Sequence, residues 1–255
     1  MTAQRYVALG SSMAAGPGIR PKAPGAPFGS GRSAVNYPHL VAGRLGYDLV
    51  DVTFSGATTA HVLSESQRGH PVQVDALDGT ESLVTVTIGG NDVGYVPYLF
   101  AAGLPGFSTS LPLLGGAVRQ MLDVAARDEA LANVGASLAT VGRELRRRAS
   151  RATVVNVDYL TLLPPAGTAA PPLSDAHAEV GRHIADTLKR HTETAAADTG
   201  CLLVRASDAS VEHHPWSANP WTTRFGVPMP GRAAPLHHNA AGMRAVADLI
   251  VTLLS

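Results

Sequence analysis

The chain has 255 residues, of which 45% are hydrophobic and 16% are charged. This balance is typical of a globular protein with a full core, and it excludes an intrinsically disordered chain. Twenty basic and twenty acidic residues give a formal net charge of zero, which argues against a nucleic-acid partner.

Membrane and export signals are weak in this sequence. No apolar run reaches the roughly 18 to 20 residues that a transmembrane helix needs. The chain passes from Met1 into an apolar run at Arg5–Leu9 without the charged and apolar regions of a signal peptide. Cys201 is the single cysteine, which excludes an intramolecular disulfide. We therefore expect a cytoplasmic protein, and the sequence does not give its oligomeric state.

Short apolar runs alternate with longer helical patterns along the chain. The predicted strands are Arg5–Leu9, Asp48–Phe54, Leu83–Ile88, Ala152–Val157 and Cys201–Val204. The predicted helices are Ser33–Leu45, Thr58–Ser64, Asp128–Arg148, Asp175–Thr199 and Ala240–Leu254. Such alternation favours βαβ units and an α/β fold with a parallel sheet of about five strands. No linker or internal repeat divides the sequence, so we expect a single domain over residues 1–255.

Three stretches are too rich in proline and glycine to read as regular structure. They are Ile19–Arg32, Val93–Gly116 and Asp208–Pro235. Val93–Gly116 is also strongly apolar. Two interpretations of it stay open: a lid or acyl-chain wall beside a binding site, or a packed loop with a short helix.

Four short blocks place polar residues directly after strands or before a helix. Gly10-Ser11-Ser12, Ser55-Gly56 and Gly89-Gly90-Asn91-Asp92 each follow an apolar run, and His237-His238-Asn239 precedes the last helix. Ligands of open parallel sheets bind at the carboxyl ends of the strands, where these blocks should lie. Taken alone, the first block is equally an ordinary strand–loop–helix whose serines cap the helix.

The ordered set of four blocks resembles the SGNH (GDSL-type) hydrolase family of esterases and lipases. The resemblance implies a three-layer α/β/α sandwich of flavodoxin-like type. It implies Ser12 as nucleophile and His237 as base, with no cofactor and no metal. It also implies an oxyanion hole formed by the backbone N–H groups of Ser12 and Gly56 and by the side-chain amide of Asn91. The implied substrate is a small-molecule ester with a small-to-medium acyl group.

This sequence departs from the family pattern at three positions. Ser11 stands where the family usually has Asp, which makes Ser11 a rival nucleophile. Ala234 stands where the family's triad Asp would be, three residues before His237. We therefore expect a Ser–His dyad whose imidazole is oriented by a backbone carbonyl near Ala234, with Asp208 or Glu212 as alternative partners. His238 replaces the usual Pro, and we expect it on the surface.

Two other functions use the same residues. The site could transfer its acyl group to a sugar or lipid hydroxyl, or the chain could be a catalytically inactive acyl-binding protein, since it lacks the triad acid. Metal binding is not indicated, because the adjacent histidines of His213-His214 and of His237-His238 should point apart. Cys201 begins a strand and is expected to be a small buried residue.

Overall fold

The computed structural model describes residues 4–229 and 231–255. Its strands form one parallel sheet in the order β2-β1-β3-β4-β5. The strands are β1 (Arg5–Gly10), β2 (Asp48–Asp51), β3 (Glu81–Thr87), β4 (Thr153–Val157) and β5 (Leu202–Val204). Residues 1–3, which enter the expectation that no signal peptide is present, lie outside the described residues.

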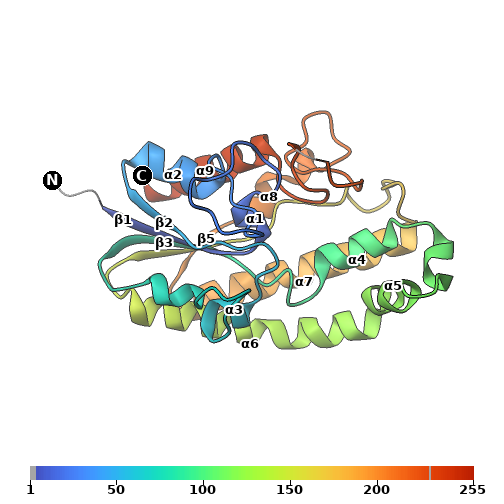
Figure 1. The fold of residues 1–255 in the computed structure, drawn as a ribbon, viewed down its shortest axis with the longest axis horizontal. Coiled ribbons are helices and arrows are strands. Elements are labelled where there is room, and N and C mark those ends of the chain that lie inside the picture. Colours follow the sequence, from blue (N-terminus) through green and yellow to red (C-terminus); the bar gives the residue numbers. More distant parts are fainter. Residues whose placement is uncertain (1–3, 230) are drawn as a thin grey trace.

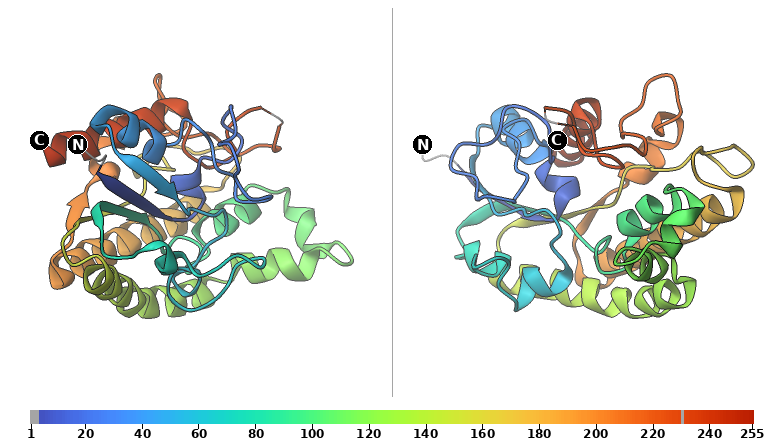
Figure 2. Two further views of the ribbon diagram at one scale, coloured as in Figure 1. Left: turned by 60° about the vertical axis from the view of Figure 1, so that its left-hand side comes forward. Right: turned by 45° about the vertical axis from the view of Figure 1, so that its right-hand side comes forward.

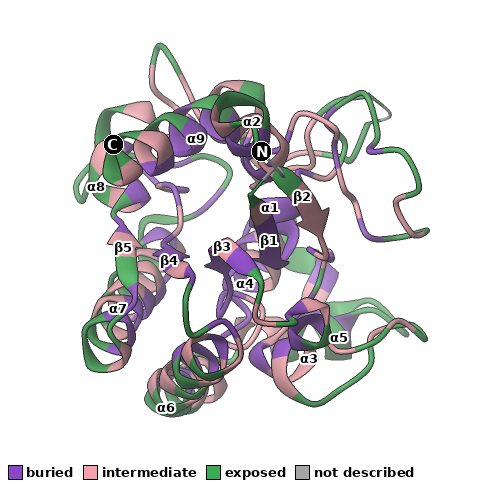
Figure 3. Ribbon diagram, turned by 90° about the vertical axis from the view of Figure 1, so that its left-hand side faces the viewer, coloured by how far each residue is buried: buried purple, intermediate pink, exposed green. Residues whose placement is uncertain are grey.

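Helices cover both faces of this sheet. Figures 1 and 3 show α2 and α9 on one face and α3, α6 and α7 on the other. The α-helices are α1 (Ser12–Ala15), α2 (Tyr37–Leu45), α3 (Thr59–Leu63), α4 (Tyr95–Ala102), α5 (Gly115–Leu122), α6 (Val124–Arg148), α7 (Asp175–Thr199), α8 (Ala206–Ala209) and α9 (Ala240–Leu254). Short 3-10 helices are η1 (Gln73–Ala76), η2 (Gly106–Ser110) and η3 (Val211–His213). The predicted three-layer α/β/α arrangement is confirmed.

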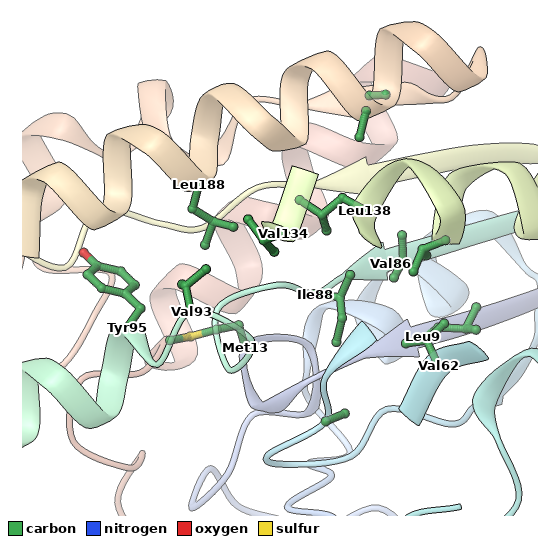
Figure 4. Close-up of a cluster of buried hydrophobic side chains, with 14 of the residues drawn as sticks. Leu9, Met13, Val62, Val86, Ile88, Val93, Tyr95, Val134, Leu138 and Leu188 are labelled. Carbon is green, nitrogen blue, oxygen red and sulfur yellow. The ribbon is translucent and has the colours of Figure 1, made fainter. Parts of the chain in front are cut away.

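Each face of the sheet has its own apolar core. Figure 4 shows part of the core on the α6 and α7 side, where Leu9, Val86 and Ile88 meet Leu138 and Leu188. The opposite core, under α2 and α9, is formed mainly by Tyr6, Tyr37, Val155, Val246 and Ile250. Burial on both faces explains why the strands read as nearly continuous apolar runs rather than as an alternating pattern.

The register of the central strands brings their carboxyl ends together. Gly10, the last residue of β1, pairs with Thr87, the last residue of β3. On the other side, Ala8 pairs with Asp51, where β2 ends. The segments that follow β1, β2 and β3 therefore leave the sheet side by side at one edge.

Three predicted boundaries differ from the structure by three residues or more, each for a local reason. The helix expected from Ser33 starts at Tyr37, because the Asn36 side chain accepts the His39 N–H and caps it there. The helix expected from Asp128 starts earlier, because the Asp123 side chain accepts the Ala126 N–H. The second strand stops at Asp51, whose carboxylate accepts both the N–H and the hydroxyl of Thr53 and turns the backbone.

The stretch Val93–Gly116 divides into two parts. Its first part contains α4, which buries Tyr95, Tyr98 and Leu99 against the core, as a packed helix would. Its second part continues through η2 to α5 and projects from the body of the molecule (Figure 2). Within the described residues, no helix combines the length and the apolar character needed to cross a bilayer.

Candidate active site

The turn after β1 is held rigidly. Gly10 has φ 130°, and a Cβ there would collide with the carbonyl of Thr87, so this position requires glycine. Ser11 donates its N–H to that same carbonyl at 2.9 Å. The Gln73 side chain bonds to both the N–H and the carbonyl of Gly10, at 2.7 and 3.1 Å. As a result, Ser12 is fixed as the first residue of α1, with 8% of its surface exposed.

His237 lies directly against this serine. Its Nε2 is 2.8 Å from the Ser12 Oγ, and its Nδ1 is 2.7 Å from the carbonyl oxygen of Pro235. A carbonyl can only accept a hydrogen bond, so Nδ1 must carry the proton and Nε2 is left as the acceptor for the serine hydroxyl. Burial lowers the pKa of His237 below its ordinary 6.5, and the Pro235 carbonyl opposes that shift only in part. A neutral imidazole in this tautomer can take a proton from Ser12.

The residue behind the imidazole differs from the expectation by one position. The carbonyl of Ala234 accepts the Thr223 hydroxyl at 2.6 Å, so it does not serve His237. The chain then turns at Leu236, whose φ of 59° folds the Pro235 carbonyl back under the ring two residues later. The expectation of a backbone carbonyl partner fits this geometry, but its assignment to Ala234 was wrong.

Neither of the alternative carboxylates reaches this histidine. Asp208 forms an ion pair with Lys189, and the Glu212 residue is exposed. In the described part of the chain, the hydrogen bonds of the His237 ring are those to Ser12 and Pro235.

The segments after β2 and β3 are tied to each other beside Ser12. The Asn91 side-chain amide donates to the carbonyl of Ala57 at 2.7 Å. Asp92 accepts the N–H of Thr59 at 3.0 Å and its hydroxyl at 2.5 Å. Gly56, with φ 81°, forms the turn just before Ala57. The backbone N–H groups of Gly56 and Ser12 donate to no acceptor among residues 4–229 and 231–255, which leaves them available to a ligand.

Sequence reasoning missed two residues that hold this edge. The Tyr159 hydroxyl accepts the Gly90 N–H at 2.8 Å, and burial raises the pKa of this tyrosine to about 12, so it is neutral. The side chain of Gln73, in η1, bonds to the backbone of Gly10. Tyr159 is the second residue after β4, and the rule that singled out the other strand ends could have found it. Gln73 lies in a short 3-10 helix with no pattern that marks it.

His238 is not on the surface as expected. It is fully buried, and neither ring nitrogen has a hydrogen-bond partner in the described part of the chain. Burial is the main cause that lowers the pKa of this imidazole to about 3, and the nearby His237 adds to it. Cys201 is buried, as predicted. No group of three His, Cys, Asp or Glu side chains that could hold a metal is found within residues 4–229 and 231–255.

Comparisons with known proteins agree over almost the whole chain. Residues 8–245 match the family described as GDSL-like Lipase/Acylhydrolase. The sequence is 33% identical to "Lipase 2" of Streptomyces coelicolor over 257 aligned positions, covering 98% of this chain and 85% of that protein. The fold is similar to the crystal structure of an extracellular lipase from Streptomyces rimosus, with a TM-score of 0.80 and 26% identity. It is also similar to phospholipase A1 from Streptomyces albidoflavus, with a TM-score of 0.79 and 25% identity. Each superposition covers 98% of this chain and 99% of the other.

The buried imidazole of His238 predicts how stability depends on pH. Its pKa is about 3 in the folded protein and about 6.5 when unfolded, so the unfolded chain binds more protons between these values. The contribution of the neutral His238 ring to the stability of the folded protein is complete above about pH 6.5 and is lost as the pH falls toward 3. When the pH is lowered from 7 to 5, the unfolding free energy of the parent should fall by roughly 2 kcal/mol more than that of His238→Leu, as measured by urea denaturation. Parallel pH curves for the two proteins would contradict this account.

Proposed function

The chain belongs to the GDSL-like lipase/acylhydrolase family and is a carboxylic ester hydrolase, and we propose that it cleaves small-to-medium acyl esters with a Ser12–His237 dyad. The observation that carries this proposal is the chain of contacts from Pro235 through His237 to Ser12, at 2.7 and 2.8 Å. A serine hydroxyl is a weak nucleophile until a base takes its proton, and the unprotonated Nε2 lies within reach of that proton.

The proposed reaction has two halves. Ser12 Oγ attacks the ester carbonyl carbon while its proton moves to His237 Nε2, and the carbonyl electrons collect on oxygen. The C–O bond to the alcohol then breaks, and the imidazolium returns its proton to the leaving oxygen. Water repeats these steps on the acyl-enzyme, which releases the acid and restores Ser12. The Pro235 carbonyl holds Nδ1–H throughout and offers partial negative charge, but no full charge, to the imidazolium.

We place the developing oxyanion between the segments that follow β1, β2 and β3. The proposed donors are the N–H groups of Ser12 and Gly56 and the side-chain amide of Asn91. One amide hydrogen of Asn91 is occupied by Ala57, so this bond aims the amide while its second hydrogen stays available. A neutral amide suits the task, because it stabilises the oxyanion without pairing with the substrate's other charges.

The proposal also covers the domain organisation and the cellular location. The two cores lie on opposite faces of one sheet, which supports a single domain over residues 1–255. The lone cysteine supports a cytoplasmic location, whereas the similar Streptomyces rimosus lipase is described as extracellular. Detection of the protein in fractionated cultures would decide between these locations.

The nucleophile is tested by comparing two neighbouring serines. Ser12→Ala should abolish both ester hydrolysis and labelling by a fluorophosphonate probe, because the attacking oxygen is gone. Ser11→Ala should keep the labelling, since Ser11 is held behind the turn with 1% of its surface exposed. Mass spectrometry of the labelled parent protein should locate the adduct on Ser12. An adduct on Ser11 would move the nucleophile, and a parent that takes no label would favour an inactive acyl-binding protein.

The oxyanion donor is tested at Asn91. Asn91→Ala should lower kcat by roughly 10²–10³ and change KM little, because the lost hydrogen bond strengthens mainly in the transition state. The melting temperature of the variant serves as the control for the lost Ala57 contact. An unchanged kcat in a folded variant would exclude this role.

The base is tested through the pH profile of kcat/KM. His237 must be neutral to act, and its burial lowers its pKa, so activity should rise through an ionisation below pH 6.5 and persist above it. His237→Ala should remove this ionisation, whereas His238→Leu should keep it. If His238→Leu silenced a folded enzyme while His237→Ala did not, the two histidines would have to exchange roles.

A further inference from the structure

Large apolar side chains are exposed mostly at one end of the molecule. Three segments carry them: residues 17–32, residues 103–119, and residues 222–229 with 231–232, and we call these segments the rim. Its exposed apolar residues are Phe28, Phe107, Leu111, Leu113, Leu114, Val227 and Met229. Leu113 is fully exposed and has φ 72°, a conformation that strains a non-glycine residue. Because its side chain is not buried against the rest of the chain, packing does not compensate for this strain. Exposed apolar groups gathered in this way mark an interaction surface.

The rim is continuous and adjoins the candidate active site. Pro17 accepts the Ala234 N–H at 2.8 Å, which joins the first rim segment to the chain after the third. Phe100 of α4, just before the second segment, packs on Phe225 of the third with ring centroids 5.3 Å apart. Figure 1 shows these segments on the side toward which the strands point, with both termini on the other side.

The first and third rim segments also touch segments of the site, and the second follows one in the chain. Ser30 accepts both the N–H and the hydroxyl of Ser55, the residue before Gly56. Thr223 donates its N–H to the carbonyl of His237 at 2.9 Å. The second segment follows α4, which begins four residues after Asn91. A surface that settled on the rim would therefore lie beside the segments that carry Gly56, Asn91 and His237.

The charge of the rim has one sign. Its sequence contains six basic residues and no acidic residue, and since the whole chain has a net charge of zero, the remainder carries −6. Arg32 lies 3.8 Å from Asp51, a half-buried ion pair. The other five are exposed and form no salt bridge within the described residues: Arg20, Lys22, Arg119, Arg224 and Arg232.

We propose that the rim docks the enzyme on an anionic lipid surface, with the ester substrate presented from that surface to Ser12. Apolar side chains with basic residues around them suit such a surface, because the acyl region takes the former and lipid phosphates attract the latter. The acidic remainder of the molecule is repelled by the same phosphates, which orients the rim toward the lipid. The delivery of substrate rests on the proposed function, whereas docking itself does not need catalysis.

Docking is measured with Ser12→Ala protein, so that the vesicles are not consumed. The probes are sedimenting vesicles of phosphatidylcholine with and without phosphatidylglycerol. Binding should be tighter to the vesicles that contain phosphatidylglycerol and should weaken at high salt. Replacing both Arg20 and Lys22 by Gln should weaken binding about 25-fold, at about fivefold for each charge. Replacing both Leu113 and Leu114 by Ser should weaken binding by at least about tenfold on either vesicle.

Matched controls come from the opposite end of the chain and from a helix away from the rim. Leu253→Ser removes an exposed leucine from α9. Arg190→Gln removes an exposed arginine from α7 that forms no salt bridge within residues 4–229 and 231–255 and donates only to the Thr187 hydroxyl at 2.8 Å. Both should bind vesicles as the parent does. In protein that keeps Ser12, the rim variants should hydrolyse a soluble short-chain ester within about twofold of the parent rate, because exposed substitutions rarely perturb a fold.

Three results would overturn docking: no vesicle binding, equal losses of vesicle binding in the rim and control variants, or a dimer of the parent that replacement of Leu113 and Leu114 abolishes. The last would make the rim a contact between copies of the chain. Failure of the proposed function looks different. In that case the vesicles are bound as described, but the parent protein hydrolyses neither soluble nor vesicle-borne esters.

Discussion

The site depends on how closely β1 approaches β3 at the carboxyl end of the sheet. Gly10 lies so near the Thr87 carbonyl that no side chain fits, and Ser11 donates its N–H to that carbonyl at 2.9 Å. This contact sets the direction in which the chain leaves the sheet, and Ser12 follows two residues later. The same strand pairing fixes where β3 ends, and thus where Asn91 begins its loop. One backbone contact therefore couples the position of the hydroxyl to that of the amide, before any side chain of the site is considered.

The carbonyl behind His237 changes the electrostatics of the site as well as its geometry. A carboxylate partner would raise the pKa of the imidazole and stabilise its charged form. The Pro235 carbonyl fixes the same tautomer, but as a dipole it offsets only part of the burial cost, and the pKa stays low. Such an arrangement keeps the imidazole of the proposed base neutral over a wide pH range and supports the imidazolium less once it forms. The turn at Leu236 is what makes the carbonyl reach the ring, so a backbone conformation stands in for a missing side chain.

The sequence predicted the α/β fold well because the fold follows from local patterns. Buried strands such as Leu83–Ile88 are visible as short apolar runs, and long amphipathic helices such as Asp175–Thr199 are visible as periodicity. Strand ends in a parallel sheet converge by topology. What could not be predicted depends on the path of irregular backbone. The choice of Pro235 over Ala234 follows from one left-handed residue, and the burial of His238 follows from the bridge of its backbone to Thr222. Neither feature leaves a periodic trace. Caps such as Asn36 were visible in the sequence, but competing polar residues nearby made their exact position ambiguous.

The composition gave the net charge of the chain, but a net charge does not show how basic and acidic residues are distributed over the surface. A net charge of zero argued against a nucleic-acid partner, yet the basic residues of the rim have no acidic neighbours in its sequence. Over a Debye length of about 8 Å at physiological salt, a ligand responds to this local set and not to the distant acidic residues. The apolar side chains then distinguish between anionic partners. A nucleic acid would leave Phe107 and three leucines in water or against phosphates, whereas a lipid surface removes them from water and neutralises the arginines in the same step. The combination of charge and apolar exposure, rather than either alone, favours lipid as the partner.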